Sequence, residues 1–299
     1  MFSPFALVPV KRREKTSHLS LILLAVGEEG KDTENRVQPL IRGELELISQ
    51  SASLIFDSCL ALLYPQSCEV CGGSVVQRQF GVACKRCWRD TQIFDGTEVC
   101  CWKCGELTRG TVPFEQRESV RCHRCEDHAF TVARAAGVYR GALRASVIRL
   151  KREPRVSSLL LNLLVNTQRR TPLNEATRIV PVPLHAQRQK TRGFNQASVI
   201  ANALGQKVAL PVDETSLVRV AHTERHRAGM DARDRRESVE NAFVVEHPRL
   251  IAGERILLVD DVFTTGATVS ECADVLLAAG AEKVFVLTIA RPLPFDYSI

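Results

Sequence analysis

The chain has 299 residues, of which 45% are hydrophobic and 25% are charged. This composition predicts a soluble globular protein with room for one α/β domain and a smaller unit. No run of about 18 apolar residues occurs, so we expect no membrane insertion. The formal net charge of +6 is suited to phosphate-rich ligands or nucleic acid.

Residues 1–44 are predicted to be a poorly ordered N-terminal extension. Basic residues precede a short apolar segment at 19–26, as in a signal peptide, but no convincing small-residue cleavage site follows. We therefore reject secretion and expect a cytoplasmic protein. Residues 45–65 have apolar side chains at helical spacing, which predicts an amphipathic helix ending at Tyr64-Pro65.

Residues 66–130 are predicted to be a cysteine-rich zinc-binding module. A C-x-x-C turn directs two thiolates at one metal ion, and two such turns complete a tetrahedral site. Sequential and interleaved pairing of the turns are both open, and Cys100 is an alternative ligand to Cys101. Disulfides are the other interpretation, which a cytosolic setting disfavours. The four pairs are Cys68/Cys71, Cys84/Cys87, Cys101/Cys104 and Cys122/Cys125.

Residues 131–299 alternate between predicted strands and helices. Strands are expected at 133–139 and 178–183, with helices at 143–150 and 157–165 between them. Residues 184–196 then read as a basic loop in which Arg188, Lys190 and Arg192 occupy alternate positions. A cationic loop between a strand and a helix suits a pyrophosphate group, while a solvated surface loop is the alternative.

Residues 217–243 are rich in arginine and poor in apolar residues. Three interpretations are open. The segment could be a mobile arm that closes over a ligand, an ordinary exposed hairpin, or a surface that contacts nucleic-acid phosphates.

A buried strand at 256–259 is followed by two acids, a loop of small residues and a helix. Asp260 and Asp261 end the strand, and hydroxyl groups, a glycine and a helix N-terminus follow. Such a loop suits an anion, and the two acids suit sugar hydroxyls. An ordinary strand end and helix cap is the alternative. The loop residues are Thr264, Thr265, Gly266, Ala267 and Thr268.

The stretch from Val259 to Thr268 closely resembles the ribose-5-phosphate loop of type I phosphoribosyltransferases. That resemblance implies that Asp260 and Asp261 are catalytic residues that hold the ribose hydroxyls of phosphoribosyl pyrophosphate (PRPP). It also implies that residues 264–268 hold its 5-phosphate, and that Mg²⁺ accompanies the pyrophosphate. Arg188, Arg192 and Gly193 would bind the substrate at its pyrophosphate end.

The order of motifs along residues 45–291 resembles the ComF competence family, which joins a zinc finger to a phosphoribosyltransferase-like domain. The resemblance implies an α/β fold of the type I phosphoribosyltransferase class, with a central, mostly parallel sheet and flanking helices. The arginine-rich segment departs from the family pattern at His226 or Arg227 and at Ser238.

Two functions are consistent with this resemblance, and both belong to natural transformation. The first is an active phosphoribosyltransferase that uses Mg-PRPP, structural zinc and an acceptor that the sequence does not identify. The second is a non-catalytic DNA-uptake adaptor that binds single-stranded DNA or a helicase-like partner. We also expect Gly266→Val to abolish phosphoribosyl binding with little effect on the fold.

Overall fold

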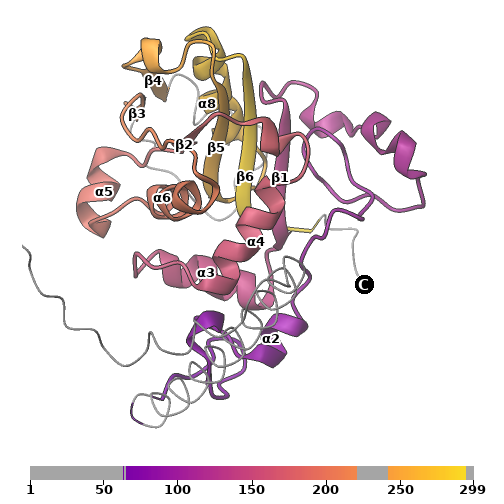
Figure 1. The fold of residues 1–299 in the computed structure, drawn as a ribbon, viewed down its shortest axis with the longest axis vertical. Helices are drawn as coiled ribbons and strands as arrows, with labels where there is room; N and C mark the ends of the chain where they lie inside the picture. Colours follow the sequence, from indigo (N-terminus) through magenta and orange to yellow (C-terminus); the bar gives the residue numbers. More distant parts are fainter. Residues whose placement is uncertain (1–62, 64, 221–241, 294–299) are drawn as a thin grey trace, which may run out of the picture. The chain divides into compact units, whose positions relative to one another are not determined.

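The computed structural model describes residue 63, residues 65–220 and residues 242–293 (Figure 1). The predicted extension at 1–44, nearly all of the predicted helix at 45–65 and most of the arginine-rich segment lie outside these residues. By their contacts, all the described residues belong to one unit, Phe56–Ile299. Within the described ranges, no helix is long and apolar enough to cross a bilayer.

Four parallel strands form the central sheet, in the order β1-β6-β5-β2. They are β1 (Val132–Val138), β6 (Lys283–Arg291), β5 (Arg255–Val262) and β2 (Arg178–Pro181). Because the strands are parallel, their carboxyl ends lie at one edge, where open α/β sheets bind ligands. Pro181 pairs with Val259, so β5 carries Asp260 and Asp261 beyond the last residue of β2.

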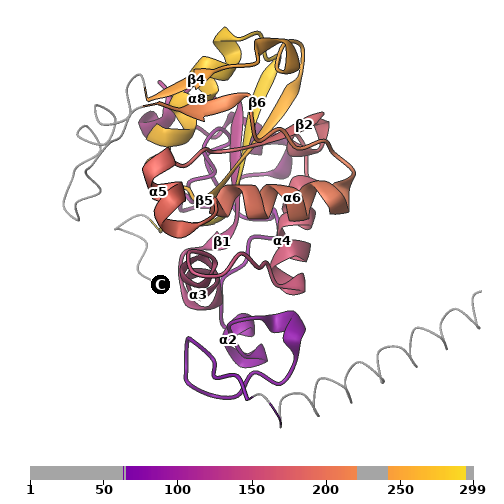
Figure 2. The ribbon, with the colours of Figure 1, turned by 90° about the vertical axis from the view of Figure 1, so that its left-hand side faces the viewer.

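Helices cover both faces of this sheet (Figures 1 and 2). Leu257 and Val259 pack in one core cluster with α4 (Ser158–Gln168) and α6 (Gln196–Val208). Ile256 and Leu258 pack in another with α8 (Ala267–Ala278). Alternate side chains of β5 therefore face opposite layers, and both faces are apolar because both are covered. The predicted fold class is confirmed.

The strands at 133–139 and 178–183 and the helices at 143–150 and 157–165 are each found within a few residues of their predicted bounds. The helix after β1 is α3 (Gly141–Leu150), and α4 follows it. Two short strands, β3 (Leu217–Arg219) and β4 (Phe243–Val245), pair antiparallel outside the main sheet. The 3₁₀ turns are η1 (Arg78–Phe80), η2 (Phe114–Ser119), η3 (His123–Cys125), η4 (Leu173–Glu175) and η5 (Pro248–Leu250).

The expectation of a continuous loop over residues 184–196 was wrong. Residues Ala186–Arg192 form helix α5, which ends at Gly193 with a left-handed φ of 81°. In an extended loop, alternate side chains share one side. In a helix, only residues about four apart do. Arg188 and Arg192 therefore lie on one face of α5, and Lys190 lies on another.

Each half of the cysteine-rich module packs on a different part of the sheet domain. The first half, with α2 (Lys85–Arg89), shares a core cluster with α3 through Trp88, Ala142 and Leu143. The second half lies alongside β1, where the Ala133 amide donates to the Lys103 carbonyl at 2.7 Å. Arg291 at the end of β6 donates to the Cys104 carbonyl at 2.6 Å.

Candidate functional site

Two adjacent carboxylates lie at the carboxyl edge of the sheet and face different neighbours. The Asp261 carboxylate is 3.7 Å from the Nζ of Lys151, which follows α3. Asp260 accepts a hydrogen bond from the backbone amide of Asp261 at 2.8 Å. The sequence analysis gave Lys151 no role. The structure places its ammonium group beside the acids.

The pKa of Asp260 is raised to about 8 by burial and by the neighbouring charge of Asp261. Lys151 and Arg219 oppose this rise. The carboxyl group is thus held where ionisation is unfavourable unless a further cation or a set of hydrogen-bond donors arrives. Raised pKa values of this kind are common at functional sites.

The loop after β5 leads into the N-terminus of α8, where the Ala267 amide donates a long hydrogen bond of 3.4 Å to the Thr265 hydroxyl. Gly266 is the N-cap residue of this helix, with φ of 84°. As a glycine, it has no side chain that could accept a hydrogen bond from the amides of the first turn. Thr264 is exposed and Thr265 and Thr268 are half-buried. First-turn amides and the positive end of the helix dipole favour an anion here. The predicted loop residues, 264–268, are therefore contiguous and lie beside the two acids.

The expectation for Gly266→Val was wrong about the fold. A Cβ at Gly266 would lie 2.7 Å from the Nε2 of His128 and 2.7 Å from the Phe263 ring. The side-chain direction at Gly266 therefore points into the protein. Substitution there would disturb packing and impose a left-handed backbone on a β-branched residue.

His128 is a residue of the site region to which the sequence analysis gave no role. Its Nε2 lies 3.1 Å from the Thr265 carbonyl oxygen, and its ring is 7% exposed. The next residue, Ala129, donates its amide to the Ser270 hydroxyl of α8 at 3.1 Å. These contacts connect residues 128–129 to the loop and to the first turns of α8. The only signal in the sequence is that His128 follows Cys125 by three residues.

Arg219, at the end of β3, is near both the basic helix α5 and the acids of β5. Burial and the nearby charge of Arg188 lower its pKa, and the charge of Asp260 acts in the opposite direction. Arg188 on α5 and Asp260 on β5 therefore both lie within electrostatic range of Arg219. The sequence placed Arg219 in the arginine-rich segment without a contact to the acids.

The α6 N-terminus carries an unpartnered buried donor. Asn195 caps α6 and its Nδ2 donates to the Val182 carbonyl at 2.9 Å, which places the helix start beside the end of β2. Gln196 is 4% exposed, and its Nε2 has no hydrogen-bond partner among the described residues. Gly193 is exposed, and a Cβ there would meet nothing within 4 Å. Its left-handed turn, not a close contact, requires glycine.

The eight predicted ligand cysteines form two clusters, each capable of holding a metal ion. Cys68, Cys71, Cys84 and Cys87 make the first, and Cys101, Cys104, Cys122 and Cys125 make the second. All four Sγ atoms of each cluster lie within 4.8 Å of one another. Pairing is therefore sequential, and Cys100 belongs to neither cluster. None of the ten described cysteines forms a disulfide.

The donor set and its spacing fit zinc. Zinc–sulfur bonds of about 2.3 Å in a tetrahedron require sulfur atoms about 3.8 Å apart. The Sγ atoms of Cys71 and Cys84 are 3.8 Å apart, and those of Cys104 and Cys122 are 3.5 Å apart. A hydrogen bond from Cys104 lowers the pKa of Cys101 to about 4, so at least one thiolate is readily available.

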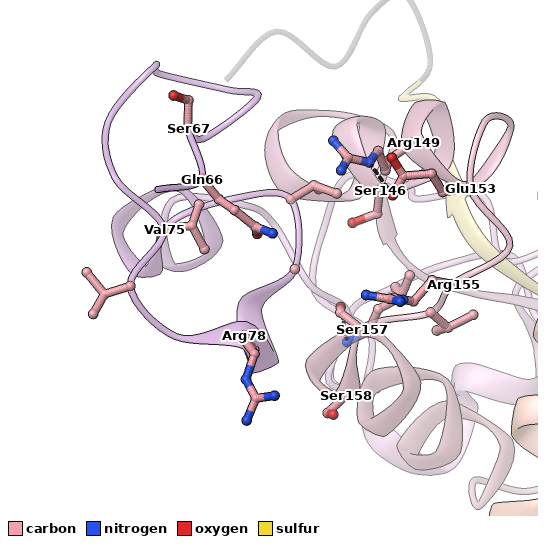
Figure 3. Close-up of a pocket in the computed structure, with 15 residues that line it drawn as sticks. Gln66, Ser67, Val75, Arg78, Ser146, Arg149, Glu153, Arg155, Ser157 and Ser158 are labelled. Carbon is pink, nitrogen blue, oxygen red and sulfur yellow. Dashed lines mark hydrogen bonds and ion pairs between the residues drawn. The ribbon is translucent and has the colours of Figure 1, made fainter. Parts of the chain in front are cut away.

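A cavity of about 680 Å³ lies elsewhere, between the first cysteine-rich half and the start of α4 (Figure 3). Its lining includes several serines and three arginines, Arg78, Arg149 and Arg155. Arg149 is already paired with Glu69 and Glu153. Asp260, Asp261 and residues 264–268 are not among the residues that line this cavity.

Residues 190–293 match the phosphoribosyl transferase domain family. The DNA utilization protein YhgH of Escherichia coli K12 is 31% identical over 241 residues, which cover 78% of this chain and all of that protein. Competence protein F of Haemophilus influenzae is 37% identical over 139 residues, 46% of this chain. That match spans 60% of the length of the relative.

Among solved structures, the glutamine PRPP amidotransferase from B. subtilis complexed with ADP and GMP superposes with a TM-score of 0.32 and 17% identity. The superposition covers 48% of this chain and 30% of that one. The score is too low to support a functional conclusion. The match over the full length of the DNA utilization protein, the match to competence protein F and the domain match together show that the chain belongs to the ComF family, as a member with a phosphoribosyltransferase-like domain.

Proposed function

We propose that the edge of the sheet binds PRPP or another phosphoribosyl ligand, and that the protein acts in DNA uptake. The observation that carries the first part is that Asp260 and Asp261 precede a small-residue loop and a helix N-terminus whose N-cap residue, Gly266, supplies no side-chain acceptor. Carboxylates accept hydrogen bonds from ribose hydroxyls, while the loop amides and threonines receive the 5-phosphate. The relatives' names, which concern competence and DNA utilization, support the second part.

The pyrophosphate end of the ligand would face the cations. Arg188, Arg192 and Arg219 supply positive charge, and the unpartnered amide of Gln196 supplies a buried donor near the same edge. An orphaned donor and a carboxyl group with a raised pKa both fit a ligand that carries phosphate groups and a divalent cation. Mg²⁺, when bound, would neutralise pyrophosphate oxygens and favour departure of pyrophosphate from C1 of the ribose.

The test is calorimetry with Mg-PRPP on the parent protein and on Asp260→Asn/Asp261→Asn. Losing two charged acceptors should weaken binding by at least about 1–3 kcal/mol. The control Asp274→Asn removes an exposed acid from α8 and should leave the affinity unchanged. If the double variant bound Mg-PRPP as tightly as the parent, the phosphoribosyl site would be refuted.

A second candidate function is a DNA-uptake adaptor that keeps the pocket as a sensor and binds single-stranded DNA or a helicase-like partner. The full-length match to a DNA utilization protein favours it. Release of pyrophosphate from PRPP in the presence of candidate acceptors distinguishes the two. Binding of Mg-PRPP without release in any acceptor screen favours the adaptor, and steady release that depends on Asp260 favours the transferase.

A further inference from the structure

A cavity of about 530 Å³ lies between the second cysteine cluster and the edge strand β1. Its floor is apolar, because Phe94, Leu107 and Ala135 pack together there and are each buried. None of the residues proposed to bind a phosphoribosyl ligand lines this cavity. We call it the β1 cleft.

Two aromatic rings stand in the wall of the β1 cleft. Trp102 is half-buried, whereas Phe114 on η2 is 75% exposed. Each ring already has a guanidinium group nearby: Arg134 lies 4.9 Å from the Trp102 ring, and Arg117 lies 5.5 Å from the Phe114 ring. An exposed aromatic residue beside a cation offers a flat surface on which another planar ring can stack.

The arginines that line the cleft outnumber the acids that line it, although Arg170 is near enough to Asp95 to help lower the pKa of that carboxyl group. Arg170 donates to the Phe94 carbonyl at 2.9 Å, and Arg117 donates to the Gly96 carbonyl at 3.3 Å. Arg169 is exposed at the end of α4. Among described residues, none of these three arginines has a carboxylate within ion-pair distance. The carbonyl bonds hold two of the guanidinium groups in place and leave their charge available.

Asp95, Glu98 and Glu118 also line the cleft, and the first two accept hydrogen bonds within their own turn. Asp95 accepts hydrogen bonds from the amide and hydroxyl of Thr97. Glu98 accepts from the amides of Asp95 and Gly96. Arg134 differs from the other arginines, because it lies beside the thiols of the second cluster and would offset their negative charge.

We propose that the β1 cleft binds one nucleotide, with the base stacked on Phe114 and Trp102 and the phosphate beside Arg169 and Arg117. An apolar ligand would cover arginines that have no anionic partner, and a bare phosphate would leave Phe114 uncovered. A base joined to a phosphate meets both requirements. The same chemistry is offered by a free nucleotide and by a single-stranded oligonucleotide.

The test uses the zinc-loaded full chain with two probes, deoxythymidine monophosphate and a fluorescein-labelled oligothymidylate. Fluorescence anisotropy measures oligonucleotide binding, and quenching of tryptophan emission reports contact at Trp102. Trp88 does not interfere, because it is 6% exposed and its Nε1 donates to the Phe80 carbonyl. Quenching by the monophosphate shows that one nucleotide suffices, and quenching by the oligonucleotide alone assigns the cleft to a strand. Quenching by neither overturns the proposal.

The variant Phe114→Ala/Arg169→Gln should bind the oligonucleotide about tenfold more weakly, the scale of one lost stacked base. The matched control is Arg249→Gln/Leu250→Ala on η5, which removes the same charge and an exposed apolar side chain. It should bind within about twofold of the parent. Equal losses in the two variants would indicate general charge attraction and overturn the proposal, as would no loss in either.

Further measurements separate loss of binding from loss of fold or zinc. Zinc content and thermal unfolding of each variant should match the parent. Arg169→Gln alone, which removes no apolar contact, should weaken binding in the same direction. Asp260→Asn/Asp261→Asn should leave oligonucleotide binding at parent strength or tighter, so failure of the phosphoribosyl proposal and failure of this one give different results.

Discussion

At the scale of single residues, the Asp260 carboxyl group combines burial with a neighbouring like charge, and its pKa is raised to about 8. Among the described residues, the hydrogen bond from the Asp261 amide and the positive charges of Lys151 and Arg219 oppose the rise. Ionisation of Asp260 without a ligand therefore costs stability. Ionisable groups in binding sites often have such shifted pKa values.

The first residue-scale prediction concerns pH. Between about pH 4 and 8, the folded chain holds a proton on Asp260 that the unfolded chain does not, so folding stability should fall as pH rises through this window. Asp260→Asn removes that dependence. The stability of the variant relative to the parent should therefore increase with pH across the window, as measured by urea unfolding. A constant difference would contradict the raised pKa.

The second residue-scale prediction concerns the packing around Gly266, in the loop between β5 and α8. Gly266→Ala forces a left-handed backbone on alanine, at roughly 1–2 kcal/mol, and also drives Cβ against His128. Gly253→Ala is the matched control, because Gly253 has φ of 77° and its Cβ would meet nothing within 4 Å. In thermal unfolding, the midpoint temperature should fall further for Gly266→Ala than for Gly253→Ala. Equal losses would show that the contact with His128 is unimportant.

At the scale of elements, α5 changes the interpretation of the basic segment. As a helix it presents Arg188 and Arg192 together and turns Lys190 away, and the nearby charge of Arg188 contributes to the lowered pKa of Arg219. Two of the three cations therefore share one face of the helix, whereas in an extended loop all three would lie on the same side.

The element-scale prediction follows from that face. Arg188→Gln/Arg192→Gln should weaken Mg-PRPP binding by about 1–3 kcal/mol, because charged hydrogen-bond donors are lost. Lys190→Gln, one charge on the other side of α5, should change affinity by less than about 0.5 kcal/mol. Calorimetry on both variants is the measurement. A Lys190→Gln loss as large as that of the double variant would mean that the segment acts through net charge alone.

At the scale of the whole molecule, Arg291 and His128 connect the second half of the cysteine-rich module to the segment between β5 and α8. Arg291 bonds to the Cys104 carbonyl and lies 5.3 Å from the Phe263 ring, and His128 bonds to Thr265. The first cluster packs against α3 instead. Metal in the second cluster should therefore stiffen the loop more than metal in the first.

The whole-molecule prediction compares one ligand from each cluster. Protein purified without chelator should contain near two zinc ions per chain, and Cys71→Ser and Cys122→Ser should each lose about one. Only Cys122→Ser should markedly weaken Mg-PRPP binding, by tenfold or so if the loop loses its support. Zinc analysis and calorimetry on both variants are the measurements, and equal effects on affinity would contradict the coupling.

The sequence by itself determined the features that depend on local spacing. Four C-x-x-C pairs predicted two four-cysteine sites, because each turn places two thiols side by side whatever surrounds it. The order of strand, two acids, small loop and helix around Asp260 predicted an anion site, because those residues are neighbours in the chain. Apolar runs on successive strands predicted a sheet covered on both faces.

Tertiary structure alone decided which distant residues complete the site. Lys151, Arg219 and His128 come from three separate parts of the chain, and no short-range pattern brings them to Asp261, Asp260 and Thr265. The side-chain direction at Gly266 was equally hidden, since it depends on what α8 packs against. Cluster pairing was settled in the same way. Local rules specify which groups a segment carries, but long-range packing specifies what those groups meet.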